Sequence, residues 1–266
     1  MQRHFHKMHG LGNDFVIIDA RKEPFEVTRS LARAIAERRT GVGCDQLIVL
    51  EPSEEADLKM RIWNSDGGEV EACGNATRCV VKLTGAGTID SDGGLLLGEN
   101  VGSEVEVSIS EPRFGWEDVP LAYAMDTDAL PMAWDLLERP MALSVGNPHL
   151  VFFVEDPDLV DLEEVGPRIE HDPAFPERIN VNVAHVSGDS IRLRTWERGA
   201  GLTLACGTGA CATAVAAIKA KRSASPVKVM MPGGSLTISW EPGSAVRMLG
   251  SATHVFEGEL DLEALR

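Results

Sequence analysis

Two cysteines, Cys73 and Cys206, stand where a side chain can transfer protons. Each is followed by a glycine and a polar residue, Asn75 or Thr208, at the start of a predicted helix rich in small residues. The first N–H groups of a helix lack partners within it, and the helix dipole is positive there. Such a position stabilises a thiolate and can bind a carboxylate, so we expect the pKa of both thiols to fall toward neutrality.

The two cysteines occupy equivalent places in an internal repeat. They lie 133 positions apart (206 − 73), and other pairs of like residues share this offset to within one position. These pairs are Trp63 and Trp196, Asn13 and Asn147, and Gln46 and Asn180. Each half therefore contains the same series of turn, strand and helix.

Hydrophobic periodicity places similar elements in both halves. Helices are expected at residues 28–39, 75–83, 161–170 and 208–221, and closing strands at 105–109 and 236–240. The third helix is less regular because Gly166 and Pro167 interrupt it. The predicted fold class is α+β, with two pseudo-symmetric α/β domains from an internal duplication. Each is expected to be a mostly antiparallel sheet or barrel around a central helix.

The repeat also predicts the domain boundaries. We expect an N-terminal domain at residues 1–115 with Cys73, and a C-terminal domain at 116–249 with Cys206. The tail, residues 250–266, is expected to pack back onto the first domain, and the Pro- and Asp-rich stretch 112–140 to form the linker. If the copies face each other about a pseudo-twofold axis, Cys73 faces Cys206 across a cleft that holds the active site.

Two facing thiols suit the racemisation of an amino acid. That reaction removes a weakly acidic proton from one face of the α-carbon and returns a proton to the other face. One cysteine must then be a thiolate while the other is a thiol, and the pair titrates jointly. Charge that builds on the α-carboxylate can be stabilised by the N–H groups of both helix ends.

Composition narrows the possible partners and cofactors. The formal net charge of −16 disfavours nucleic acid and anionic membranes, and the N-terminus has no signal-peptide core. Hence we expect a cytoplasmic protein without nucleic-acid or membrane partners. Five cysteines without a CxxC pair argue against disulfides and a metal site, and no cofactor is expected. Of these, Cys44, Cys79 and Cys211 are interpreted as buried packing residues.

From end to end, the chain resembles the diaminopimelate epimerase family. The segments that carry the resemblance are residues 8–15 (MHGLGNDF), 40–46 (TGVGCDQ), 72–75 (ACGN), 146–149 (GNPH) and 197–209 (ERGAGLTLACGTG). The resemblance implies interconversion of LL- and meso-diaminopimelate without pyridoxal phosphate or metal, on the route to lysine and peptidoglycan. It also implies a homodimer that acts on a small amino-acid substrate.

The same resemblance implies a role for each matching residue. Cys73 and Cys206 match the catalytic pair, and His149 and Glu197 match residues that support catalysis. The substrate-binding positions are Asn13, Gln46, Asn64, Gly74, Asn75, Asn147, Asn180, Glu197, Arg198, Gly207 and Thr208. One departure is Ala76-Thr77, where the family commonly has Gly-Ala; both residues are small, so we expect little effect on activity, although Thr77 can alter the fit at that helix end.

Several alternatives stay open. His149 is either a hydrogen-bonded structural histidine or a group that acts in catalysis. Adjacent Glu197 and Arg198 suit the ammonium and carboxylate of a second amino-acid centre, which favours diaminopimelate over a proline- or histidine-type racemase substrate. The alternative from another class is a non-enzymatic binding or thiol-redox protein, which would not exchange α-protons.

Overall fold

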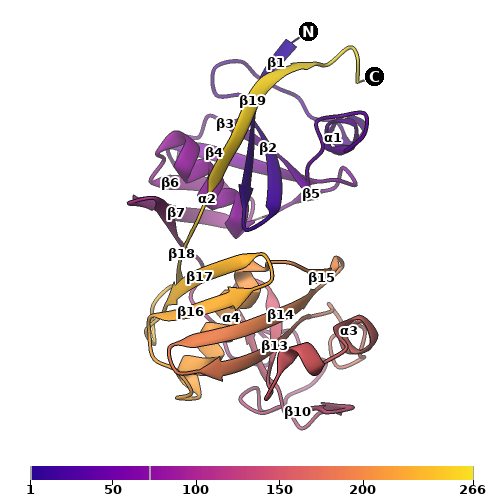
Figure 1. Ribbon diagram of the computed structural model, residues 1–266, viewed down its shortest axis with the longest axis vertical. Helices are drawn as coiled ribbons and strands as arrows, with labels where there is room; N and C mark the ends of the chain where they lie inside the picture. Colours follow the sequence, from indigo (N-terminus) through magenta and orange to yellow (C-terminus); the bar gives the residue numbers. More distant parts are fainter. Residues whose placement is uncertain (1, 72, 266) are drawn as a thin grey trace. The chain divides into compact units, whose positions relative to one another are not determined.

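Each half of the sequence repeat folds into a mixed β-sheet packed against a buried helix (Figure 1). The computed structural model describes residues 2–71 and 73–265. The chain divides into unit 1, Met1–Val107 with Gly250–Arg266, and unit 2, Ser108–Leu249. In the described part of the chain, no helix has the length and apolar character of a membrane span.

The elements up to residue 108 are β1 (Gln2–Gly10), β2 (Asn13–Asp19), α1 (Arg29–Ala36), β3 (Gln46–Glu51), β4 (Leu58–Asn64), β5 (Glu69–Val70), α2 (Gly74–Thr84), β6 (Thr88–Ser91), β7 (Gly94–Val101) and β8 (Glu104–Ser108). Those that follow are β9 (Ala133–Trp134), β10 (Leu137–Glu138), β11 (Met141–Ser144), β12 (Pro148–Phe153), a 3₁₀ turn (Pro157–Leu159), α3 (Leu162–Glu170), β13 (Asn180–Ser187), β14 (Ser190–Glu197), β15 (Gly201–Thr203), α4 (Gly207–Lys219), β16 (Val227–Met231), β17 (Gly234–Ser239), β18 (Arg247–Gly250) and β19 (Thr253–Asp261). The four helices begin and end within three residues of their predicted bounds.

The register of the strands reproduces the sequence repeat. In unit 1, β2 and β3 run parallel with Phe15 opposite Gln46. In unit 2, β12 and β13 run parallel with His149 opposite Asn180. Each of these two residues lies 134 positions after its counterpart in unit 1, Phe15 or Gln46. The β4–β6 and β14–β16 pairs are parallel as well, whereas β1–β19, β1–β2, β3–β4, β6–β7, β11–β12, β13–β14 and β16–β17 are antiparallel. The predicted duplication and the mostly antiparallel sheets are thus confirmed.

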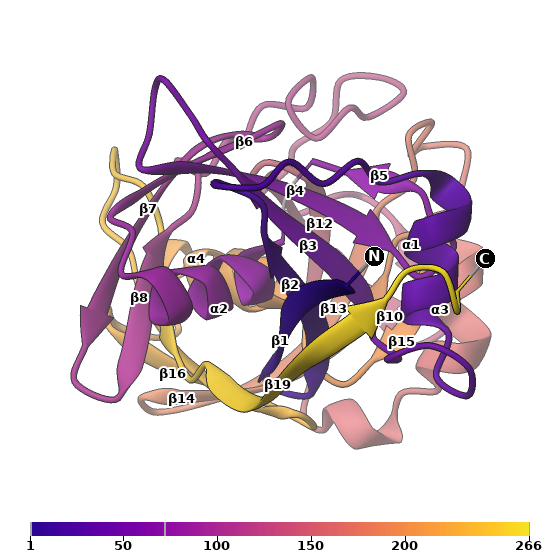
Figure 2. The same cartoon turned by 90° about the horizontal axis from the view of Figure 1, so that it is seen from above.

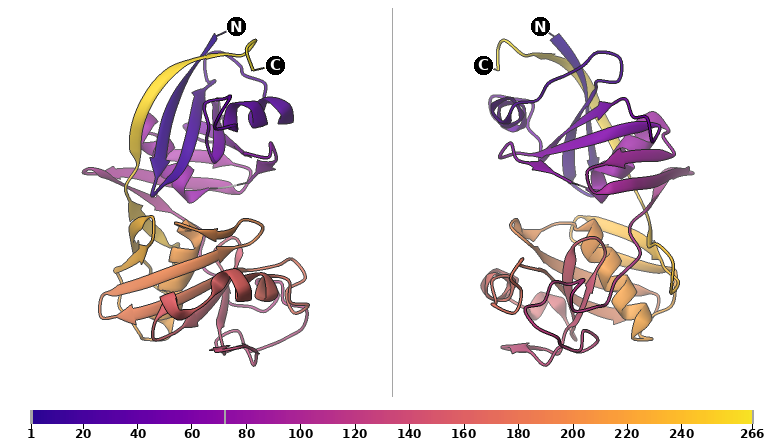
Figure 3. Two further views of the ribbon diagram at one scale, coloured as in Figure 1. Left: turned by 45° about the vertical axis from the view of Figure 1, so that its right-hand side comes forward. Right: turned by 180° about the vertical axis from the view of Figure 1, so that it is seen from behind.

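The helices that follow the two cysteines form the centre of each unit. In unit 1, α2 is flanked by β7 on one side and by β1 and β2 on the other (Figure 2). In unit 2, α4 packs across the strands, and its residues from Gly209 to Ala217 are buried (Figure 3). A helix that is buried all round must be apolar all round, and small side chains let the strands approach it closely. The α2 helix ends at Gly85, whose φ of 74° is the left-handed conformation typical of helix C-termini.

The third helix differs from the prediction, because α3 continues through Gly166 and Pro167. Its first turn is capped by Asp161, whose side chain accepts a hydrogen bond from the N–H of Glu164 at 3.1 Å. A glycine is required at position 166 for a steric reason, since a Cβ atom there would lie 2.6 Å from the Trp196 ring. The cap and the apolar face of α3 outweigh the one backbone hydrogen bond that proline removes.

The interpretation of residues 112–140 as a linker is wrong. This segment contributes apolar side chains to the core of unit 2, together with those of β12, α3 and β13. The buried members are Val119, Leu121, Leu130, Trp134 and Leu137. Prolines and aspartates lie between these residues, and for that reason the composition resembles a linker while the segment is a packed layer.

Candidate active site

Each central helix begins directly after one of the two predicted cysteines. Cys73 is the N-cap residue of α2 and Cys206 is that of α4, both with the extended backbone usual at this position. Cys206 is buried, and its Sγ accepts a hydrogen bond from the N–H of Gly209 at 3.3 Å. Cys73 is half-buried, and its carbonyl accepts a hydrogen bond from Thr77 Oγ1 at 2.9 Å. The predicted helix-end placement is confirmed, whereas the catalytic role stays a prediction.

In unit 1, the predicted amides form two hydrogen-bonded groups. Asn13 Oδ1 accepts from Cys73 Sγ at 3.8 Å and from Asn75 Nδ2 at 3.3 Å. Gln46 lies opposite Asn64 across β3 and β4, and its Nε2 donates to Asn64 Oδ1 at 2.8 Å. The buried Gln46 Oε1 accepts no hydrogen bond from any residue that the structure describes. It is therefore available to a donor on a ligand.

A cluster of charges that sequence reasoning missed holds Asn13 in place. Asn13 Nδ2 donates to Asp45 Oδ2 at 3.0 Å, and Arg38 bridges Asp45 Oδ1 at 2.7 Å and Asp14 Oδ1 at 2.8 Å. Lys7 Nζ donates to Asp14 Oδ2 at 2.6 Å. Burial alone would raise the pKa of Asp14, but the hydrogen bonds from Arg38 and Lys7 hold it well below its usual range. Asp14 therefore stays ionised and anchors the start of β2, where Asn13 lies.

Arg78 is a second residue that sequence reasoning missed. It is completely buried within α2, and its Nη2 donates to Asn75 Oδ1 at 2.7 Å. Its Nε donates to the carbonyl of Ser251 at 3.3 Å. Since Arg78 occupies Asn75 Oδ1, the amide nitrogen of Asn75 is turned toward Asn13. A lone arginine among the small residues of the helix was the signal available in the sequence.

In unit 2, a chain of polar contacts leads from Cys206 into the core. Cys206 Sγ lies 3.6 Å from Thr208 Oγ1, which accepts from Asn147 Nδ2 at 3.3 Å. Asn147 Oδ1 lies 2.9 Å from His149 Nε2, and His149 Nδ1 lies 3.1 Å from Asn182 Nδ2. Sequence reasoning singled out four of these five residues and missed Asn182, which is two positions after Asn180 on β13.

The contacts of His149 fix its protonation state. The Asn182 amide donates to His149 Nδ1, because its oxygen already accepts from Thr195 Oγ1 at 3.1 Å. The ring proton therefore sits on Nε2 and is donated to Asn147 Oδ1. Burial, followed by the positive charge of Arg198, lowers the pKa of His149 to about 3. His149 is thus neutral at physiological pH and orients Asn147.

The expectation that the helix end lowers the pKa of Cys206 is wrong, because the pKa is raised. Burial and then the nearby carboxylate of Glu197 raise the pKa of Cys206 well above its usual range, against the hydrogen bonds from Thr208 and Gly209. Burial also raises the pKa of Glu197, although hydrogen bonds from Thr203 and Cys206 oppose this. Thr203 Oγ1 donates to Glu197 Oε1 at 2.5 Å. Cys206 is consequently a thiol in this structure, beside a carboxylate that can accept its proton.

The remaining predicted residues of unit 2 line the end of β14. Asn180 Oδ1 accepts from the backbone N–H of Arg198 at 2.9 Å. The Arg198 side chain is exposed, and its Nη1 donates to the carbonyl of Glu177 at 3.1 Å. Glu170, which sequence reasoning missed, is buried and accepts from Trp196 Nε1 at 2.8 Å. The turn that carries Arg198 is therefore fixed through its backbone while the guanidinium stays accessible.

The other cysteines match their predicted structural role. Cys44, Cys79 and Cys211 are buried, and burial raises the pKa of Cys44 to about 11 and that of Cys79 to about 12. Such thiols are unreactive at neutral pH. The departure at Ala76-Thr77 also fits, because the buried Thr77 satisfies its hydroxyl within the first turn of α2.

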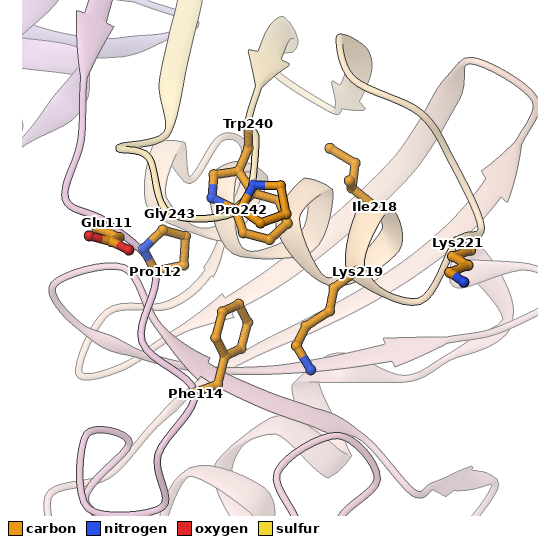
Figure 4. Close-up of a pocket in the computed structure, with 9 residues that line it drawn as sticks. All are labelled: Glu111, Pro112, Phe114, Ile218, Lys219, Lys221, Trp240, Pro242 and Gly243. Carbon is orange, nitrogen blue, oxygen red and sulfur yellow. The ribbon is translucent and has the colours of Figure 1, made fainter.

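One pocket of about 430 Å³ in unit 2 contains none of the predicted site residues. It lies between the C-terminal end of α4 and the segment after β17, with Phe114 and Trp240 on its wall (Figure 4). The ring centroids of Phe114 and Trp240 are 6.2 Å apart, and Lys219 Nζ lies 4.9 Å from the Phe114 ring. The predicted residues instead lie in both units, with Cys73 hydrogen-bonded to Asn13 in unit 1 and Cys206 in contact with Thr208 in unit 2.

Known proteins of one family are similar to this chain over nearly its whole length. A family model described as diaminopimelate epimerase matches residues 5–112 and 141–255. The chain is 63% identical over 267 residues to a protein from Rhizorhabdus wittichii named diaminopimelate epimerase, and the match covers 99% of this chain and 97% of the relative. The part between the two matched ranges contributes apolar side chains to the core of unit 2.

Solved structures with low sequence identity share the fold. A Bacillus anthracis phenazine biosynthesis protein of the PhzF family has a TM-score of 0.69 at 16% identity, over 98% of this chain and 99% of the other. A hydroxyproline epimerase from Agrobacterium vitis has a TM-score of 0.65 at 13% identity, over 97% and 92%. These similarities concern the duplicated α+β architecture alone.

Proposed function

This chain belongs to the diaminopimelate epimerase family, and from that premise we propose that it interconverts LL- and meso-2,6-diaminopimelate with two cysteines as acid and base. The proposal is supported by the family model and by relatives that are nearly identical in length. The observation that carries the chemistry is the placement of Cys73 and Cys206 at the N-termini of the two central helices.

Cys206 acts as the acid in one direction of the reaction. Its raised pKa keeps the proton on sulfur until a carbanion forms at the α-carbon. Cys73 removes the α-proton from the opposite face in the same step. For the reverse direction, Glu197 takes the proton of Cys206 and leaves a thiolate, and the raised pKa of Glu197 suits this exchange. Glu197 is therefore assigned to proton transfer rather than to the second ammonium of the substrate.

The helix ends bind the carboxylate of the reacting centre. Gly74 and Asn75 begin α2, and Gly207 and Thr208 begin α4. Because Gly209 N–H is already bonded to Cys206 Sγ, we assign carboxylate binding at α4 to the two N–H groups before it. His149 is hydrogen-bonded to Asn147, and we assign it the role of orienting Asn147 rather than contacting the substrate.

Arg198 and the unit 1 amides bind the centre that does not react. The Arg198 guanidinium is exposed and can form a bidentate pair with the distal carboxylate. Gln46 Oε1 offers an acceptor to the distal ammonium, with Asn64 holding the Gln46 side chain. Asn13, Asn147 and Asn180 complete the polar set.

Further features of the proposal rest on the sequence repeat, the composition and the family resemblance. We propose that the two thiols act on opposite faces of one carbon. We also propose a homodimer that works in the cytoplasm, within lysine and peptidoglycan biosynthesis, and whose reaction uses neither pyridoxal phosphate nor metal. The net charge of −16 supports the absence of nucleic-acid partners.

The decisive assay is incubation with LL-diaminopimelate in D₂O, with no cofactor added and after dialysis against a chelator. We expect deuterium at the α-carbon together with meso product. Proline and histidine, which have one charged amino-acid centre, serve as parallel substrates. Faster exchange with proline or histidine would show that diaminopimelate is not the preferred substrate. Exchange with none of the three would show that the protein is a binding or redox protein instead of an epimerase.

A further inference from the structure

The first and last strands of unit 1 bring three metal-ligating side chains together, outside the residues discussed so far. His6 lies on β1, and His254 and Glu257 lie on β19, which pairs antiparallel with β1. Their ligand atoms all lie within 4.8 Å of one another. Over residues 2–71 and 73–265, no other set of three or more His, Cys, Asp or Glu side chains has this geometry.

The register of the two strands explains the grouping. His6 is directly opposite Glu257, so the two side chains share one face of the sheet. A β-bulge next to Met8 then pairs Met8 with His254, where regular alternation would place Val255. A bulge of this kind redirects a side chain. It turns His254 onto the face that His6 and Glu257 occupy.

The separations of the donor atoms match a tetrahedral metal site. His6 Nδ1 lies 3.2 Å from His254 Nε2 and 3.4 Å from Glu257 Oε2. Zinc binds nitrogen and oxygen at about 2.0–2.1 Å, so adjacent ligands of a tetrahedral ion are roughly 3.3 Å apart. His4 shares the face, and its Nε2 lies 3.9 Å from Glu257 Oε2. It can take the fourth position.

We propose that His6, His254 and Glu257 form a binding site for a divalent transition metal, with Zn²⁺ as the best fit. Two imidazoles favour zinc, nickel or copper over magnesium and calcium, and one carboxylate partly balances the charge of the ion. The site is separate from both cysteines in sequence and belongs to unit 1 alone.

A ligating imidazole gives the metal the lone pair of a ring nitrogen, and His6 Nδ1 lies within 3.4 Å of the ligand atoms of both His254 and Glu257. A bound ion would replace the hydrogen bond between His6 and His254, and it would join the first strand of the chain to the last.

The test is titration of the metal-free full chain with ZnCl₂ by calorimetry, and with CoCl₂ by visible absorption. We expect one bound ion and a higher Tm with zinc, since a ligand that binds only the folded chain stabilises it. His6→Ala and His254→Ala should each weaken binding by at least about tenfold and abolish the rise in Tm. Glu257→Gln, which keeps the shape of the side chain, should weaken binding as well.

His171→Ala is the matched control, because His171 is an exposed histidine of unit 2 whose Nδ1 contacts a backbone carbonyl. It should bind zinc as the parent does. Equal affinity in the parent, His6→Ala and His254→Ala would overturn the proposal. So would sulfur-to-cobalt charge-transfer absorption in the Co²⁺ adduct, because the ion would then be held by thiolates. Neither result bears on the epimerase assay, which is run without metal.

Discussion

Replacing His149 by leucine is expected to remove a defined part of the acid sensitivity of folding. His149 is completely buried with a pKa of about 3, against 6.5 for an exposed histidine. Between these values, the unfolded chain binds a proton that the folded chain does not. The stability linked to His149 is therefore complete above pH 6.5 and is lost as the pH falls from 6.5 toward 3.

The size of this effect follows from the same values. One pKa unit corresponds to about 1.4 kcal/mol, so lowering the pH from 6.5 to 4 costs the parent about 3 kcal/mol through His149. At pH 7, His149→Leu should be less stable than the parent by about 1–3 kcal/mol, because Asn147 and Asn182 lose a buried hydrogen-bond partner. That difference should shrink and then change sign as the solution is acidified.

The assay is urea denaturation of both proteins at four pH values between 7 and 4, followed by tryptophan fluorescence. The carboxylates titrate alike in the two proteins, so the difference between their free energies of unfolding isolates His149. A difference that stays constant from pH 7 to pH 4 would refute the reasoning. A His149 imidazole signal that titrates near pH 6.5 in NMR would refute it as well.

Three further substitutions probe the site. Glu197→Gln should lower kcat by about 10²–10⁴ and let iodoacetamide alkylate Cys206 at lower pH, because burial would still raise the pKa of Cys206 but the Glu197 charge would no longer add to it. An unchanged alkylation profile would show that Glu197 takes no part in the proton transfer. Arg198→Lys should raise KM for diaminopimelate at unchanged Tm, since lysine lacks the planar fork of arginine. A KM equal to that of the parent would show that Arg198 is a surface charge that does not bind the substrate. Gly209→Ala should cost about 1–3 kcal/mol in urea denaturation, because the added Cβ would lie 2.6 Å from Asn182 Oδ1, and parental stability would show that the contact relaxes freely.

The duplication was predictable because one offset along the chain relates both the repeated residues and their strand partners. The offset of 134 that relates Gln46 to Asn180 is also the offset of their strand partners, Phe15 and His149. The cysteines were placed correctly for a local reason: a small-residue helix that begins after a glycine can be recognised without knowledge of the fold. Local pattern therefore gave the elements and the helix-end thiols.

What the sequence could not give depends on burial and on long-range contacts. The pKa of Cys206 rises because tertiary packing excludes water and brings Glu197 close, and neither effect is visible in a helix-start motif. Arg78 is identified as a buried donor only once Ser251, 173 positions away, is seen to accept from it. Likewise, His254 reaches the face of His6 through a bulge, which a regular strand pattern does not predict.

The most direct test of the two-cysteine account follows α-proton exchange in D₂O for Cys73→Ser and Cys206→Ser, each with LL- and with meso-diaminopimelate. A serine hydroxyl is a far weaker base than a thiolate, so each variant should lose exchange from one stereoisomer more than from the other. The two variants should show opposite preferences, and net epimerisation should collapse in both. Cys211→Ala, which changes a buried packing residue, should retain exchange from both stereoisomers. If one cysteine proves essential for exchange from both stereoisomers while the other is dispensable, a single base does the work and the account is wrong.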